Sequence, residues 1–241
     1  MSRIIVALFF VGSILMSFLL QFADHPSLSM RHCLQRSKCQ TCQHELKLLD
    51  LVPILSYCAL KGRCRFCRQR IPISLFIGEV LGGCIIIYPL LLPVYIPLKT
   101  FYVMALLLLT IAIVDIRTQL ILHRFLCLIS ILLVALHPSF YTDVPHLLLW
   151  VTTFLIGCIQ QNYVGMGDIK LFLIIIFFFP VPFLLFFLEL IFPIGCILLP
   201  ISFMFNWIHQ RRVPLAPAIF TAFVTVSTIY PQLISFYGGF L

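Results

Sequence analysis

The chain has 241 residues, of which 62% are hydrophobic and only 10% are charged, and its mean hydropathy is +1.12. A soluble domain of this length needs far more polar surface, so the composition excludes a water-soluble protein and predicts an all-α polytopic membrane protein. The formal net charge of +8 does not indicate a nucleic-acid partner, because the positive residues gather in one loop and beside predicted membrane spans.

Eight apolar stretches are long enough to cross a bilayer as helices. The first is expected to be a retained membrane helix, because no small-x-small signal cleavage site follows it. Prolines interrupt the sixth and seventh stretches, so their shared boundary is the least defined. The predicted spans are residues 3–22, 73–94, 98–116, 120–137, 145–160, 169–187, 188–208 and 215–236.

The loop formed by residues 23–72 contains nine of the 16 Lys and Arg residues. If the eight spans alternate in direction, five further basic residues fall on the same side, and only Arg3 and Lys99 fall on the other. Cytoplasmic loops carry the excess of Lys and Arg, so the loop is predicted to be cytoplasmic and both termini to lie outside. The expected organisation is a first transmembrane helix (1–22), a cytoplasmic Cys-rich loop (23–72) and a seven-helix membrane core (73–241).

Six of the ten cysteines lie in this loop, and four form the sequences "CQTC" and "CRFC". A C-x2-C pair on a tight turn directs two thiolates at one point, and two such pairs complete the tetrahedral sulfur shell that Zn²⁺ prefers. Structural disulfides are not expected in a reducing compartment. A structural zinc site is therefore predicted at Cys39, Cys42, Cys64 and Cys67.

Three alternatives accompany this zinc prediction. One C-x2-C pair could carry thiol-redox chemistry, although redox chemistry would not need the second pair. The cysteines could also be free thiols. Nearby residues could also replace a cysteine ligand, and the candidates are His32, Cys33, His44 and Cys58.

Two acidic residues are predicted at the cytoplasmic ends of spans. Asp115 ends the third span and Asp168 begins the sixth. Ionisable groups at membrane depth are costly, and two carboxylates in one site tend to share a single proton. Such a pair suits peptide hydrolysis, in which one carboxylate takes a proton from water and the other carboxyl group donates one to the carbonyl oxygen.

Two glycines precede Asp168 in the sequence "GMGDIK". Gly165 and Gly167 would leave room for a substrate backbone and permit non-helical dihedral angles. The simpler interpretation is that Asp168 caps its helix and that Asp115 pairs with Arg117 or Arg124.

Taken together, these features resemble the type IV prepilin peptidase family of GxGD-type aspartyl membrane proteases. The resemblance rests on six ordered matches, including Glu79 at the acidic position of the second span. In chain order they are "VGSILMSFLL", "RSKCQTCQHELKLLDLVPILSYCALKGRCRFCRQRIP", "SLFIGEVLGG", "VDIRTQLI", "GMGDIKL" and "RVPLAPAIF".

The resemblance implies catalytic roles for Asp115 and Asp168, and substrates that are prepilins or pseudopilins with a short basic leader, cut at the cytoplasmic face of a bacterial inner membrane. Many members also methylate the new amino terminus with S-adenosylmethionine. Glu79 and Lys170 are candidates for substrate contact or methyl transfer. No G-x-G-x-x-G sequence supports methylation independently.

Three positions depart from the family pattern, namely Leu20, Gln40 and Ala216, and none is a predicted catalytic or zinc residue. The alternative function is a membrane thiol-redox or zinc-dependent assembly factor in which the aspartates are structural. The sequence does not indicate which prepilin is the client, what the oligomeric state is, or which aspartate holds the proton.

Overall fold

The computed structural model describes residues 2–24, 38–39, 41–46, 48–136, 140–159, 165–204 and 213–236. Within these ranges the chain is helical, and its extended pairings are two isolated antiparallel bridges. The eight predicted apolar helices are all found: α1 (Ser2–Asp24), α4 (Ile73–Leu91), α5 (Leu98–Thr118), α6 (His123–Leu136), α7 (Val144–Ile159), α8 (Met166–Ile175), α9 (Val181–Met204) and α10 (Ala216–Phe236). The short helices η1 (Leu48–Leu51) and α3 (Leu55–Ala59) lie between α1 and α4.

Five of these helices are long and apolar enough to cross a membrane, namely α1, α4, α5, α9 and α10. The helices α6 and α7 are apolar but shorter, with 14 and 16 residues. These helices confirm the prediction of an all-α, multi-pass membrane protein.

The predicted boundary between the sixth and seventh helices, at residues 187 and 188, is wrong. The helix α8 ends at Ile175 and α9 begins at Val181, so the predicted boundary lies inside α9. Pro180 and Pro182 flank the start of α9, where the first turn of a helix tolerates a ring without an N–H. The apolar run contains three prolines, and the sequence alone did not show which of them marks the start of a helix.

The backbone between α8 and α9 is irregular, and other elements satisfy its carbonyl groups. The Tyr141 N–H donates to the Phe177 oxygen at 3.0 Å. The buried ring of His146 places Nε2 3.1 Å from the Phe179 oxygen. Carbonyl groups away from water need such partners, so these contacts stabilise the break between the two helices.

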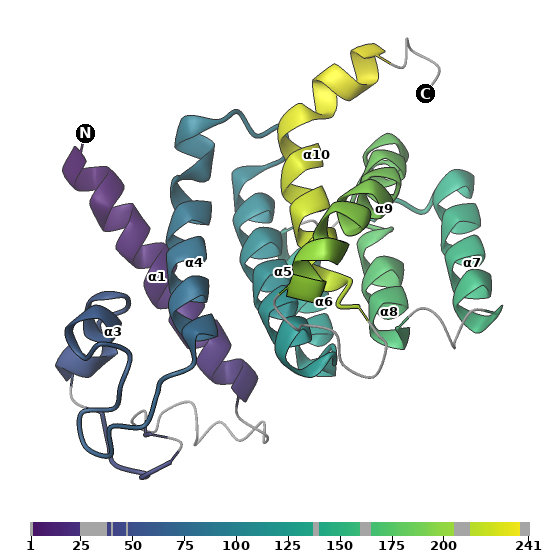
Figure 1. Ribbon diagram of the computed structural model, residues 1–241. Helices are drawn as coiled ribbons and strands as arrows, with labels where there is room; N and C mark the ends of the chain where they lie inside the picture. The colour runs from purple at the N-terminus through teal and green to yellow at the C-terminus, as the bar shows by residue number, and fades with distance from the viewer. Residues whose placement is uncertain are drawn as a thin grey trace. The chain divides into compact units, whose positions relative to one another are not determined.

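Contacts between helices divide the chain into two compact units, Met1–Leu91 and Leu92–Leu241. In the first unit α1 crosses α4 closely (Figure 1). Gly12 and Gly82 make the crossing possible, because a Cβ atom on either would collide with the other helix. This unit therefore contains α1, the Cys-rich loop and α4. The division into a first helix (1–22), a Cys-rich loop (23–72) and a membrane core (73–241) stays a prediction.

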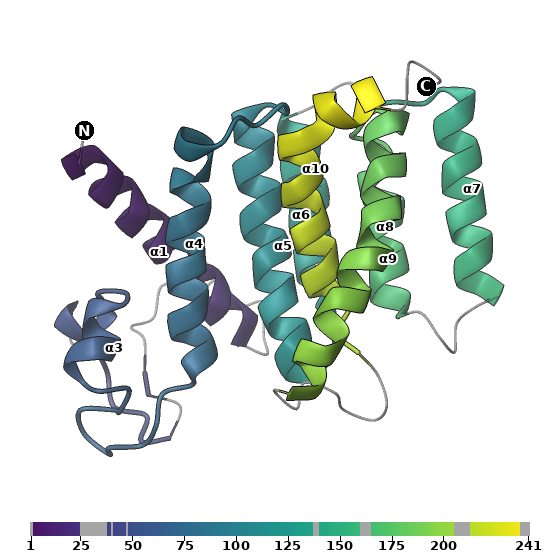
Figure 2. The ribbon, with the colours of Figure 1, turned by 45° about the horizontal axis from the view of Figure 1, so that its top comes forward.

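In the second unit α10 packs against both α5 and α9 (Figure 2). A cluster of phenylalanine rings fills the space between them, with centroids of contacting pairs 5.0 to 6.4 Å apart. Aromatic pairs at these separations contribute packing energy beyond their buried area. The cluster consists of Phe101, Phe179, Phe183, Phe187 and Phe223, and it fixes α10 beside α5.

Candidate active site and metal centre

Asp115 lies in the last turn of α5 and is 7% exposed. Its Oδ2 atom accepts a hydrogen bond of 3.1 Å from the backbone N–H of Ala216, which is the first residue of α10. The N-terminus of a helix carries partial positive charge and stabilises a nearby carboxylate. The α10 N-terminus therefore holds the Asp115 side chain in place.

Asp168 lies in the first turn of α8 and is 9% exposed. Its Oδ1 atom is buried and has no hydrogen-bond partner among the residues that the structure describes. The charge of Asp115 acts on Asp168, so the fold brings together two carboxyl groups that are 53 positions apart in sequence. A buried oxygen without a donor is costly unless it carries a proton or meets a ligand.

Asp168 does not cap its helix through its side chain. Gly165 is the N-cap of α8, and no side chain makes a capping hydrogen bond there. The alternative in which Asp168 is a simple capping residue is therefore not what the structure shows.

The two glycines before Asp168 allow neighbouring side chains to lie close to the backbone. A Cβ atom on Gly165 would lie 2.7 Å from Asp168 Oδ2, and one on Gly167 would lie 2.7 Å from the Cβ of Ile121. The Gly165 dihedral angles, φ −63° and ψ 128°, are open to any residue. At Gly165 the sequence therefore needs space beside the carboxylate, and backbone freedom is not required there.

Lys170 lies two residues after Asp168, and its Nζ is 3.0 Å from Nε2 of His123 at the start of α6. Both residues are exposed. The structure thus places a cationic group close in sequence to Asp168 and leaves it accessible.

Glu79 belongs to the other unit, where both of its carboxylate oxygens accept hydrogen bonds. Ser17 on α1 donates to Oε1 at 2.9 Å, and the Ile54 N–H donates to Oε2 at 2.8 Å. Ile54 has a φ of 64°, which is rare for a β-branched residue. Glu79, which lies in α4, thus joins the middle of the Cys-rich loop, between its two cysteine pairs, to α1.

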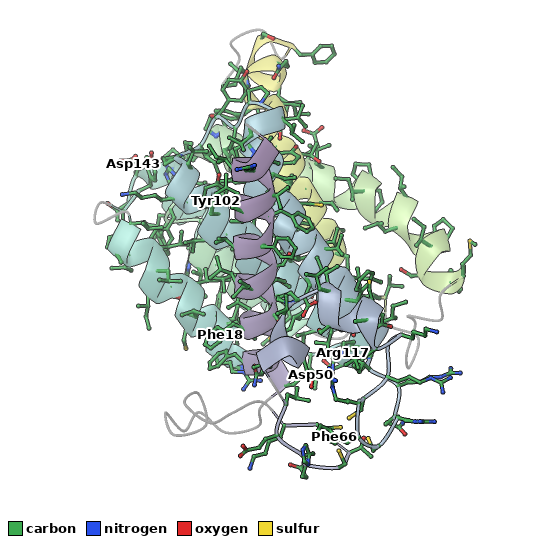
Figure 3. The ribbon with its side chains drawn as sticks, turned by 90° about the vertical axis from the view of Figure 1, so that its left-hand side faces the viewer. Phe18, Asp50, Phe66, Tyr102, Arg117 and Asp143 are labelled. Carbon is green, nitrogen blue, oxygen red and sulfur yellow. The ribbon has the colours of Figure 1, made fainter. Side chains whose placement is uncertain are left out.

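The four predicted metal ligands come together in one cluster. The Sγ atoms of Cys39, Cys42, Cys64 and Cys67 all lie within 4.8 Å of one another. The Cys39 and Cys67 sulfurs are 3.8 Å apart. Tetrahedral Zn²⁺ with Zn–S bonds of about 2.3 Å requires ligand sulfurs about 3.8 Å apart, so the residues present fit this metal. Figure 3 shows sulfur atoms gathered beside Phe66 in this loop.

Two of the alternative ligands lie apart from the cluster. The His44 ring packs on Phe66 with centroids 3.6 Å apart, and Cys58 is exposed on α3. Neither belongs to the group of potential ligands found among the described residues. His32, Cys33 and Gln40 lie outside those residues.

The environment of the cluster favours a thiolate at Cys39 and disfavours one at Cys67. Hydrogen bonding from the backbone N–H of Cys42 is the main cause that lowers the pKa of the Cys39 thiol to about 6. At Cys67 the N–H of Gln69 acts in the same direction, but desolvation and the neighbouring thiols raise its pKa to about 11. Four thiols in one place therefore do not ionise together on their own, and a bound cation would be needed to hold all four as thiolates.

Comparison with known proteins decides the family. The model of the bacterial peptidase A24 N-terminal domain matches residues 10–92, and that of the type IV leader peptidase family matches residues 102–201. A prepilin leader peptidase/N-methyltransferase of Bacillus subtilis is 30% identical over 243 residues, which cover 95% of this chain and 96% of the relative. This chain belongs to the type IV leader peptidase family.

Two other members of the family align over different lengths. A Vibrio cholerae protein named prepilin leader peptidase/N-methyltransferase is 26% identical over 207 residues, which are 79% of this chain and 80% of the relative. A Pseudomonas putida protein of the same name is 44% identical over 52 residues, 22% of this chain and 17% of its own. No solved structure matches.

The hydrogen bond from the N–H of Ala216 to Asp115 was not predicted from the sequence. The Ala216 side chain is a methyl group, so residue type carried no signal. The surrounding "VPLAP" pattern, with Pro214 and Pro217 on either side, was the available sign that the start of α10 has a special geometry.

Proposed function

We propose that this chain is a membrane aspartyl endopeptidase that removes the short basic leader of type IV prepilins or pseudopilins at the cytoplasmic membrane face. One observation supports the proposal: Asp115 and Asp168, on different helices, are both buried, and the charge of Asp115 acts on Asp168, in a member of the leader peptidase family. The names of the relatives supply the substrate class.

The proposed reaction uses the two carboxyl groups in different protonation states. The ionised carboxylate takes a proton from water while the water oxygen attacks the scissile carbonyl carbon. The protonated carboxyl donates its proton to the carbonyl oxygen. The carboxyl that took the proton from water then gives it to the leaving amine nitrogen, while the other carboxylate takes back the hydroxyl proton as the C–N bond breaks. The space kept open by Gly165 lets the peptide backbone approach Asp168.

Zinc is the proposed metal of the four-cysteine cluster, and its role is structural. The loop has little apolar core of its own, so bound metal would supply part of its folding free energy. Four thiols in one tetrahedral group support this role over thiol-redox chemistry by a single C-x2-C pair.

Methylation of the new amino terminus, with S-adenosylmethionine as methyl donor, is supported by the names of the relatives. Roles of Glu79 and Lys170 in substrate contact or methyl transfer stay predictions. The exposed Lys170 is free to reach a substrate backbone or acidic group, whereas Glu79 already accepts two hydrogen bonds. The inner-membrane location with a cytoplasmic loop follows from charge distribution.

The test is removal of the leader from a co-expressed prepilin, followed by gel shift. We expect Asp115→Asn and Asp168→Asn each to lower the cleavage rate by about 10²–10⁴-fold, because the amide keeps the shape but loses acid–base function. Asp143→Asn, at an exposed position before α7, is the matched control and should cleave normally. Cleavage retained by either catalytic variant at parental membrane levels would refute the assignment.

A further inference from the structure

The Cys-rich loop contains two knuckles that share one backbone design. The first runs from Lys38 to Glu45 and the second from Arg63 to Arg70, and in each an antiparallel bridge joins the first residue to the last. The residue after the second cysteine is left-handed in both, with φ 56° at Gln43 and φ 57° at Arg68. The two knuckles can therefore be compared position by position.

The bridge of the second knuckle brings its two arginines close together. The Cys64 N–H donates to the Gln69 oxygen and the Ile71 N–H donates to the Gly62 oxygen, both at 2.8 Å. These bonds flank the bridge, so Arg63 and Arg70 form a non-hydrogen-bonded antiparallel pair. Side chains of such pairs leave the same face at the shortest separation found in antiparallel strands.

The charges at this position differ between the knuckles. In the first knuckle Lys38 faces Glu45, and their charged atoms are 4.0 Å apart. In the second knuckle two exposed arginines face each other, an arrangement that is destabilising in the absence of an anion.

No acidic residue occurs between positions 61 and 70, so the negative charge in this knuckle is that of the Cys64 and Cys67 thiolates, which a bound zinc ion would partly neutralise. The nearby Asp50 is already bound to Arg65, at 2.6 Å. An anion from outside the knuckle would therefore relieve the repulsion between Arg63 and Arg70.

The position of the pair along the chain limits what that anion can be. Arg70 lies three residues before Ile73, the first residue of the membrane-spanning helix α4. Three residues reach at most about 11 Å, so the pair lies near the depth of lipid headgroups. Guanidinium groups bind phosphate through paired hydrogen bonds, and basic segments beside a span attract anionic lipids.

We propose that Arg63 and Arg70 form a binding site for the phosphate of an anionic phospholipid, which holds the second knuckle at the membrane surface. The site does not depend on the peptidase reaction. A basic prepilin leader has the same sign of charge as the arginines and is repelled by them.

The test uses the full-length, zinc-loaded protein in detergent, titrated with phosphatidylglycerol or phosphatidylcholine at physiological salt and read by native mass spectrometry. The mass reports bound lipid and bound zinc together. We expect selective retention of phosphatidylglycerol. Arg70→Glu should weaken that binding about tenfold. The substitution replaces the two facing arginines by an ion pair like that of Lys38 and Glu45 in the first knuckle.

Arg68→Glu is the matched control, since it changes the net charge equally but lies outside the bridge. It should weaken binding clearly less than Arg70→Glu does, because it leaves the Arg63–Arg70 pair intact. Equal losses in the two variants, or equal retention of phosphatidylcholine, would overturn the proposal. So would displacement of the lipid by equimolar inorganic phosphate. If Arg70→Glu loses zinc, Arg63→Gln replaces it as the test variant, and unchanged lipid binding there would also refute the site.

Discussion

Ala216 shows how a residue without a functional side chain takes part in the candidate active site. Its backbone N–H, at the start of α10, is the donor that binds Asp115 Oδ2. Asp168 Oδ1 has no such donor in the described part of the chain. The two carboxyl groups therefore stand in different hydrogen-bonding environments, which is the asymmetry that a shared-proton mechanism uses.

This contact leads to a prediction for Ala216→Pro. Proline is accepted at the first position of a helix, so α10 should still form, but the N–H that binds Asp115 is lost. A hydrogen bond to a charged group contributes about 1.5–3 kcal/mol, so we expect the cleavage rate to fall roughly 10- to 100-fold. The measurement is the prepilin gel shift at equal membrane levels.

Ala216→Gly is the comparison variant, because it keeps the N–H and removes only a methyl group. It should cleave substantially faster than Ala216→Pro. Equal activity of the two variants would show that the hydrogen bond to Asp115 does not contribute to catalysis.

At the scale of elements, the crossing of α1 and α4 depends on glycine. A Cβ atom on Gly12 would overlap the backbone of Gly82, and one on Gly82 would overlap Met16. Small residues let membrane helices approach until their backbones touch, which gives dispersion contacts and weak Cα–H hydrogen bonds in place of a hydrophobic driving force. Glu79 adds a polar contact to Ser17 across the same pair.

We predict that Gly12→Ala lowers the free energy of unfolding by about 1–3 kcal/mol through overpacking, despite the better helix propensity of alanine. Thermal unfolding of the purified protein in detergent would measure this. Gly195→Ala in α9 is the control, since its Cβ would make an ordinary contact of 3.9 Å with Ala218. A transition temperature for Gly12→Ala at or above that of the control would contradict the packing argument.

At the scale of the whole molecule, the Cys-rich loop belongs to the compact unit Met1–Leu91, and the two proposed catalytic carboxyl groups belong to the unit Leu92–Leu241. The loop holds its shape through four cysteines, the knuckle hydrogen bonds and the Glu79 contact to Ile54. Zinc should therefore affect the folding of this loop more than the geometry of Asp115 and Asp168.

We predict one zinc per chain, released as the pH falls from 7 to 5. Zinc is released at low pH because protons compete with the metal for the thiolates, and each thiolate that accepts a proton can no longer bind zinc. The low pKa of Cys39, about 6 without metal, makes its thiolate available near neutral pH. A colorimetric zinc assay across this range, with proteolysis of the loop in parallel, measures both effects.

Cys58→Ser is the control for the zinc prediction. Cys58 is exposed and lies outside the four-cysteine cluster, so its loss should leave zinc content unchanged, whereas Cys64→Ser should abolish stoichiometric binding. Zinc retained in full by Cys64→Ser would rule out the cluster as the metal site.

The sequence alone determined the membrane class, the eight apolar helices, the four cysteines and the two aspartates. These features are local: an apolar run of sufficient length is helical in lipid because its backbone has no other hydrogen-bond partners, and a C-x2-C turn directs its own thiols. The family resemblance added the reaction, and the comparisons confirmed the family.

Only the tertiary structure decided that α9 begins at Val181, between two prolines, and which N–H binds Asp115. It also decided which groups bind Glu79 and that two arginines face each other in one knuckle. Each of these depends on a partner that composition does not specify. Ala216 is 101 positions from Asp115, and Ser17 is 62 from Glu79. Hydrophobicity assigns a residue to lipid or water, but the pairing of polar groups is chosen by how the helices pack.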